Sequence, residues 1–139
     1  MSISQKCGTS VIIYKDGKIL LQQRKDNKCW GYVGGYIELG ETVEAAAKRE
    51  MFEECGLTAS SLELFGVFSG AELHHIYPDG NEVHIIDIVF VCSEFTGSLK
   101  PQVSEVLDLQ WFDCDKIPEN ISPPVKPGLM KFIKGQLWR

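Results

Sequence analysis

The chain has 139 residues, 44% of them hydrophobic, with a formal net charge of −5 and a pI of about 5.2. This length suits one domain over residues 1–139, because independent domains are commonly about 100–200 residues long. Such a domain buries enough surface to fold without a disulfide or a structural metal. The acidic balance excludes a global basic field that would attract nucleic acid or an anionic membrane.

The cysteines and the N-terminus predict the compartment. Five cysteines are scattered without a CxxC pair or zinc-type spacing: Cys7, Cys29, Cys55, Cys92 and Cys114. They are expected to be reduced thiols. The N-terminus lacks a basic region followed by a long apolar run, and no segment approaches the ~20 apolar residues of a membrane span. We therefore expect a cytoplasmic protein with no membrane partner.

The first third of the chain contains a hairpin signal. Residues 9–23 predict two strands around Asp16-Gly17, because Asp-Gly tolerates the positive φ angles that tight hairpins require. The next stretch, 24–35, is predicted to be a loop. Its final glycines, Gly34 and Gly35, are expected to allow a tight turn or a close approach.

The segment 42–55 predicts a helix, with Thr42 as N-cap and Gly56 as the C-terminal stop. Beyond it we expect a strand near 62–68, a hairpin centred on 78–80, a long buried strand over 83–95 and a short strand over 107–112. A closing helix is predicted over about 124–138. Strands dominate and helices are interspersed, so the predicted fold class is mixed α and β, an α/β (α+β) domain.

Three carboxylates share one side of the predicted helix near its C-terminal end. Glu50, Glu53 and Glu54 fall within an arc of roughly 100°, since neighbours at i, i+3 and i+4 lie side by side. Repulsion between them and their opposition to the helix dipole cost up to ~1 kcal/mol each. A solvated acidic face is the alternative, but a hard cation such as Mg²⁺ or Mn²⁺ offsets this cost, because it takes oxygen ligands. Arg49 is placed to hold Glu53 in one rotamer.

These residues resemble the signature of a known family. The pattern G-x5-E-x7-R-E-U-x-E-E-x-G-U, with U a bulky apolar residue, is the Nudix box of MutT-like hydrolases. Every defined position is filled, by Gly35, Glu41, Arg49, Glu50, Met51, Glu53, Glu54, Gly56 and Leu57. The strand order around the box also looks like a Nudix domain. Many family members have a proline before the double glycine, where this chain has Val33.

The resemblance implies the fold and the roles of the box residues. It implies a mixed β-sheet sandwiched between helices. It further implies that Glu50, Glu53 and Glu54 bind Mg²⁺ or Mn²⁺, that Gly35 offers its carbonyl oxygen and that Glu41 supports the site from the helix entry.

Family members often recruit another carboxylate from a loop ahead of a later strand. Glu105, six residues before Trp111, is the candidate here, as a metal ligand or general base. Three rivals remain open: Glu82, Asp87 and Glu94.

Three residues outside the box are candidates for substrate binding. Arg24 ends the second predicted strand, where a guanidinium fork can bind phosphate. Trp30 and Tyr32 are candidates to stack on a nucleobase, and packing on the core is the alternative for both. His74, His75 and His84 show no HExxH or paired spacing, so we expect them to be structural or solvated.

The resemblance implies a hydrolase that cleaves a phosphoanhydride bond in a nucleoside diphosphate linked to another moiety. Water would attack phosphorus after a glutamate, Glu53 or Glu105, removes its proton. A non-catalytic nucleotide-sensing module and an isoprenoid diphosphate isomerase are the alternatives. The complete Nudix box argues against the sensing module. The expected partner is a small nucleotide-like diphosphate, with a homodimer possible. The sequence leaves the individual substrate open.

Overall fold

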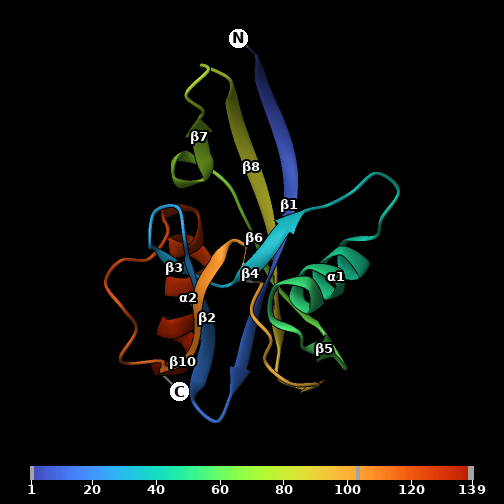
Figure 1. Cartoon of the computed structure of the whole chain (residues 1–139), viewed down its shortest axis with the longest axis vertical. Helices are drawn as coiled ribbons and strands as arrows, with labels where there is room; N and C mark the ends of the chain where they lie inside the picture. The colour runs from blue at the N-terminus through green and yellow to red at the C-terminus, as the bar shows by residue number, and fades with distance from the viewer. Residues whose placement is uncertain (1, 103, 138–139) are drawn as a thin grey trace.

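A mixed β-sheet forms the centre of the molecule, with one α-helix on each side of it (Figure 1). The computed structural model describes residues 2–102 and 104–137. Its elements are β1 (Ile3–Lys15), β2 (Lys18–Arg24), β3 (Trp30–Gly31), β4 (Val33–Tyr36), α1 (Val43–Cys55), β5 (Thr58–Ala59), β6 (Glu63–Phe68), η1 (Ala71–Leu73), β7 (His74–Ile76), β8 (Glu82–Cys92), β9 (Phe95–Thr96), β10 (Val106–Asp113), η2 (Pro123–Val125) and α2 (Lys126–Leu137). The strand order is β10-β2-β1-β8-β6, while β3 pairs with β2, β4 with β1 and β7 with β8.

The predicted first hairpin is confirmed. Asp16 and Gly17 have φ angles of 53° and 79° between β1 and β2, as a two-residue hairpin turn requires. β1 starts at Ile3, before the predicted boundary, because it pairs in parallel with β8 from Ile3 to Ile13. This long parallel pair is the spine of the sheet.

The prediction of a loop over residues 24–35 is wrong in its second half, where β3 and β4 form. β3 pairs with β2, which is already part of the first hairpin, and β4 pairs with β1, which is distant in sequence. Local composition does not reveal such pairing. The expected close approach at Gly34 is confirmed: a Cβ on Gly34 would lie 2.6 Å from the carbonyl oxygen of Thr9 in β1. Gly34 therefore lets β4 lie tightly against β1.

The core has two layers, one on each face of the sheet. Along β1, Val11 and Ile13 belong to the cluster beneath α1, and Ile12 belongs to the cluster beneath α2. This alternation is the period of two expected for a strand buried on both faces. Helix α1 contributes Ala47, Met51 and Cys55, and α2 contributes Leu129, Phe132 and Ile133. The predicted mixed sheet between helices is confirmed.

Helix α1 begins and ends where the sequence predicts. The Thr42 side chain accepts a hydrogen bond from the Ala45 backbone N–H, and Gly56 adopts a left-handed conformation with φ of 80°. These two contacts satisfy backbone groups that a helix leaves unpaired at its ends. The caps fix the axial position of the helix, and with it the height at which its glutamates meet the sheet.

The C-terminal half differs from prediction at its boundaries. β8 ends at Cys92, and Phe95 belongs to β9, which pairs with β5 instead. The closing helix is preceded by the 3-10 turn η2 at Pro123–Val125, and Trp138 lies outside the described residues. Within residues 2–102 and 104–137, neither helix has the length and apolar character required to cross a membrane.

Candidate active site

The box glutamates meet the sheet at β4. Ala46 and Ala47 are fully buried, so α1 lies close to the strands and carries the next turn of the helix onto the glycine pair. A Cβ added to Gly35 would lie 2.5 Å from the carboxyl carbon of Glu50. Only glycine at position 35 leaves room for the Glu50 carboxylate.

Glu54 is held on the sheet by two donors. Its Oε2 atom accepts hydrogen bonds from Gln22 Nε2 at 2.9 Å and from the Gly34 backbone N–H at 3.0 Å. Burial raises the pKa of Glu54 to about 7, against the lowering effect of these two bonds. A carboxyl group with such a pKa gains most from a nearby cation, because the cation favours the ionised form.

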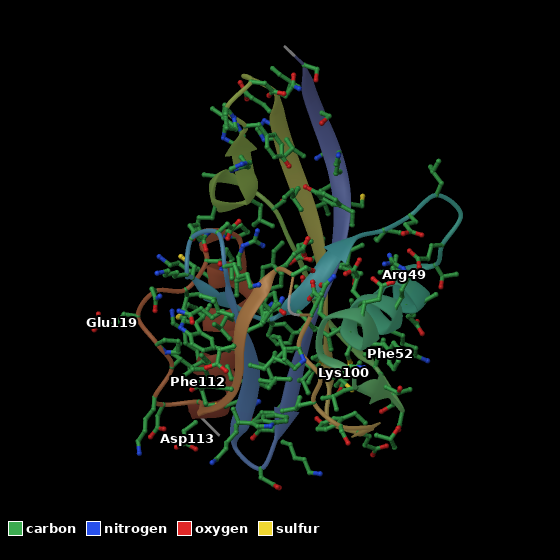
Figure 2. All side chains as sticks on the ribbon, viewed as in Figure 1. Arg49, Phe52, Lys100, Phe112, Asp113 and Glu119 are labelled. Atoms are coloured by element: carbon green, nitrogen blue, oxygen red, sulfur yellow. The ribbon has the colours of Figure 1, made fainter. Side chains whose placement is uncertain are left out.

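Arg49 connects the loop after β4 to the carboxylates of α1 (Figure 2). Its Nε and Nη2 atoms donate to the two oxygens of Glu41 at 2.7 and 2.9 Å, and Nη1 donates to Glu50 at 2.8 Å and to Glu53 at 3.3 Å. The guanidinium holds the pKa of Glu41 at about 2. Arg49 thus fixes the carboxylates around it in single orientations.

The three proposed ligands have different surroundings. The Glu53 side chain is 52% exposed, whereas that of Glu50 is 15% exposed. In the described part of the chain their ligand atoms do not all lie within 4.8 Å of one another, because Arg49 holds Glu50 and Glu53 while β2 and β4 hold Glu54. All the donors are oxygens, the ligand type that Mg²⁺ and Mn²⁺ prefer, so the residues fit such an ion.

A cavity of about 400 Å³ opens beside these carboxylates, and Gly35 and Glu54 are part of its wall. Three further wall residues each carry a buried polar atom with no hydrogen-bond partner among the described residues: Gln22 Oε1, Tyr32 Oη and Ser122 Oγ. An unsatisfied buried polar group costs about 1–3 kcal/mol. A polar ligand that gained access to these atoms would remove that cost.

A buried acid lies on the wall of the same cavity. Asp87 is 7% exposed, and the Ser10 hydroxyl donates a hydrogen bond shared between its two carboxylate oxygens, at 2.9 and 3.0 Å. Burial raises the pKa of Asp87 to about 6. The sequence identified Asp87 only as a rival to Glu105, and it missed Gln22, Ser10 and Ser122. For Gln22 the sequence does offer a signal, because it is a polar residue that directly follows the apolar strand residues "ILL".

Two of the predicted substrate residues line the cavity. Tyr32 is 5% exposed and Arg24 is exposed. Arg24 forms a fork with both oxygens of Asp26, at 2.9 and 2.7 Å. Trp30 instead packs edge-on against Phe112, with ring centroids 5.0 Å apart, in the core beneath α2. For Trp30 the structure favours the alternative that the sequence left open, a packing role.

Glu105 lies next to the end of β2. Its carbonyl oxygen accepts a hydrogen bond from the Lys25 backbone N–H at 3.0 Å. Its charge contributes to the raised pKa of both Arg24 and Glu54. The loop before β10 therefore brings Glu105 near the cavity, as its sequence position suggested.

The sheet between two helices and the box carboxylates, one of which lines the cavity, define a Nudix-type protein. Residues 6–132 match the NUDIX domain family. The chain is 40% identical over 111 residues to the ADP-ribose pyrophosphatase of Methanocaldococcus jannaschii, an alignment that covers 78% of this chain and 62% of that protein. It is 34% identical over 119 residues to the oxidized purine nucleoside triphosphate hydrolase of Danio rerio, covering 83% and 70%.

A solved structure shares the fold. The MutT NUDIX hydrolase from Burkholderia pseudomallei superposes with a TM-score of 0.79 at 29% identity, and the alignment covers 91% of this chain and 96% of that one. The chain therefore belongs to the Nudix family. The resemblance carried by the box is confirmed. The chain spans less than two thirds of the length of the M. jannaschii relative.

Proposed function

We propose that this protein hydrolyses a phosphoanhydride bond in a nucleoside diphosphate linked to another moiety, with Mg²⁺ or Mn²⁺ as cofactor. One observation carries the proposal. The box residues Glu54 and Gly35 line the same cavity as Tyr32 and Ser122, whose buried hydroxyl oxygens have no hydrogen-bond partner among the described residues. A substrate with a charged diphosphate and a polar nucleoside matches both groups of residues.

The side chains would divide the work by position. Glu50, Glu54 and Glu53 would hold the cation, with the Gly35 carbonyl oxygen as a further ligand, and Arg49 and Glu41 would keep the carboxylates in place. When bound, the cation neutralises the diphosphate oxygens and lowers the pKa of a bound water. Glu53 or Glu105 would accept the proton of the attacking water.

Arg24 would bind a phosphate oxygen at the open end of the cavity. Its side chain is 56% exposed and is already oriented by its fork with Asp26. A guanidinium held in this way loses little rotamer entropy on binding. The buried hydroxyl of Tyr32 and that of Ser122 would hydrogen-bond the nucleoside, a role in which the Tyr32 ring need not stack on the base.

The substrate class proposed first is ADP-ribose or a similar nucleoside diphosphate sugar. The M. jannaschii relative named ADP-ribose pyrophosphatase supports it, with the higher identity of the two relatives compared, 40%. Oxidised purine nucleoside triphosphates are the second candidate. The D. rerio relative supports them, because the chain covers 70% of that protein.

A hydrolysis assay on purified full-length protein tests the proposal. ADP-ribose and an oxidised purine nucleoside triphosphate are each incubated with Mg²⁺, with Mn²⁺ and with excess EDTA, and products are separated by chromatography. AMP with ribose 5-phosphate supports the first substrate, and a nucleoside monophosphate with pyrophosphate supports the second. Equal turnover in EDTA refutes the metal role, and nucleotide binding without turnover supports the sensing module instead.

A further inference from the structure

The β7–β8 hairpin carries a second group of side chains with metal-binding chemistry. β7 and β8 are antiparallel, and His74 lies directly opposite His84, while Ile76 lies opposite Glu82. Since side chains alternate along a strand, His74, Glu82 and His84 share one face of this hairpin. In Figure 1, β7 and the adjoining end of β8 extend away from both helices.

These three side chains converge on one another. Glu82 Oε2 lies 3.0 Å from His74 Nε2 and 3.9 Å from His84 Nε2. The two imidazole rings are stacked with centroids 4.4 Å apart and planes 12° from parallel. In the described residues, one ligand atom from each of the three lies within 4.8 Å of the other two. The same carboxylate oxygen therefore lies within hydrogen-bond distance of His74 Nε2 and just beyond it from His84 Nε2.

The spacing suits a tetrahedral ion with nitrogen and oxygen ligands. At Zn–N and Zn–O bond lengths of about 2.0–2.1 Å, two ligands of a tetrahedral site lie about 3.3 Å apart. The observed separations of 3.0 and 3.9 Å lie on either side of that value. His74 and Glu82 are about a third exposed and His84 about half exposed, so the imidazole rings have room to rotate out of their stacked arrangement, as coordination of one ion by both in-plane lone pairs requires.

The hairpin backbone holds the group in place. The connecting turn is closed by hydrogen bonds from the Tyr77 N–H to the Asn81 carbonyl at 2.8 Å and from the Gly80 N–H to the Tyr77 carbonyl at 2.9 Å. The Glu82 N–H donates to the Ser2 carbonyl at 2.8 Å, which ties the start of β8 to β1. A site on paired strands needs little ordering when an ion binds.

We propose that His74, Glu82 and His84 form a binding site for Zn²⁺ or a chemically similar transition-metal ion. Imidazole nitrogens suit zinc, nickel and copper, whereas Mg²⁺ takes oxygen ligands. The site lies on the face of β8 opposite to Ile85 and Asp87, which line the main cavity. It is therefore distinct from the carboxylates of α1.

A bound ion would clamp β7 onto β8. β7 has three residues, His74–Ile76, and the residues on either side of it, Leu73 and Tyr77, line the main cavity. Joining His74 to His84 across the strands would reduce the opening of this short pair. The expected effect is a firmer cavity wall, seen as slower amide exchange at residues 74–76.

Calorimetric titration of the full chain with ZnCl₂, in millimolar Mg²⁺ to occupy the oxygen ligands of α1, tests the site. The background carries Cys7→Ser and Cys29→Ser, because these two thiols are not buried and thiolates bind zinc. We expect one ion per chain, and a loss of affinity of at least about 10-fold in His84→Gln and in Glu82→Gln.

His75→Gln is the matched control, because the neighbouring His75 makes an edge contact with Tyr77 instead, at 4.6 Å between ring centroids. It should bind zinc as the background does. In parallel, imidazole NMR signals of His74 and His84 should shift with zinc while those of His75 stay. Binding that survives both ligand variants, or that is lost equally in His75→Gln, overturns the proposal, and so does a chain that binds no zinc.

Discussion

The α1 end and the β7–β8 end of the molecule each bring carboxylates together with nitrogen-bearing side chains, but in opposite proportions. On α1 the carboxylates are in excess, and one cation, Arg49, contacts Glu41, Glu50 and Glu53. On the hairpin the ratio is reversed, with a single carboxylate between two imidazoles. An oxygen-rich, anionic group favours a hard ion, and a nitrogen-rich group favours a borderline one. The balance of carboxylates and cations would therefore suit the two ends to different metal ions.

The largest effect is expected at Glu54. Glu54→Gln keeps an oxygen that accepts from Gly34 N–H but loses the charge that a cation requires. We expect kcat to fall by roughly 10³-fold or more, as for other groups that act directly on the reaction, while zinc binding at the hairpin is unchanged. Steady-state assays in Mg²⁺ measure kcat, and calorimetry with Zn²⁺ measures binding at the hairpin in the same variant.

Glu44→Gln is the matched control, because Glu44 lies in the first turn of the same helix and is exposed. It should retain wild-type turnover. If Glu54→Gln is as active as Glu44→Gln, Glu54 is not a ligand, and the α1 end is only an acidic surface.

A smaller loss of activity is expected at Arg49, which contacts the carboxylates rather than substrate. Arg49→Lys keeps the charge but cannot contact Glu41 with two nitrogens and Glu50 with a third. We expect a loss of about 10- to 100-fold in activity or metal affinity, typical of groups that orient metal ligands. The Mg²⁺ concentration at half-maximal rate measures it. Lys48→Gln, at the exposed neighbouring position, should show no change.

The α1 end was predictable from sequence because its spacing is local. Residues at i, i+3 and i+4 on one helix are neighbours wherever the helix lies, so Glu50, Glu53 and Glu54 were identified without any tertiary information. The link from Arg49 to Glu41 was not predicted, since the loop after Tyr36 has no periodic geometry. The caps at Thr42 and Gly56 were predicted for the same local reason as the glutamates.

The cavity and the hairpin site were not predictable in this way. Ser10, Asp87 and Ser122 line one cavity because β1 and β8 are in parallel register and residues 121–122 lie beside Trp30 of β3. Likewise, His74 and His84 are ten positions apart and become neighbours only through strand pairing. Register depends on contacts between distant segments, and no motif of the kind used for zinc spacings captures it. The sequence therefore predicted the carboxylates of α1 but not the groups that strand pairing brings together.

Asp87 lies on the cavity face of β8, opposite to the hairpin site, and its ionisation is expected to make the free energy of unfolding depend on pH. Burial raises its pKa from 3.8 to about 6, so the folded state binds this proton more tightly than the unfolded state. Stability therefore falls as pH rises from about 4 to about 6 and is constant above that for this group. Asp87→Asn removes this loss and should stabilise the protein by about 3 kcal/mol at pH 7.

Urea unfolding of wild type and Asp87→Asn between pH 4 and pH 8 measures this difference. The two free energies of unfolding should agree near pH 4 and diverge by pH 7, while the contribution of Glu54 is common to both and cancels. Parallel curves across the whole range would show that Asp87 is already ionised at low pH. Zinc binding at the opposite face of β8 should be the same in both proteins.

The smallest effect on metal-free stability and on hydrolysis is expected at His84. The variant His84→Gln should lose zinc stabilisation, which distinguishes the hairpin site from the α1 carboxylates. The His84 side chain is 49% exposed and lies 3.9 Å from Glu82, so His84→Gln should change the free energy of unfolding by no more than about 0.5 kcal/mol in metal-free buffer. Hydrolysis with Mg²⁺ should stay within about twofold of wild type, because surface contacts of this kind contribute little. Zinc at 100 times its Kd should stabilise wild type by about 2.7 kcal/mol and His84→Gln far less. Thermal melts with and without ZnCl₂, in the Cys7→Ser, Cys29→Ser background and in millimolar Mg²⁺, measure this gap, and equal zinc-induced shifts would exclude the hairpin site.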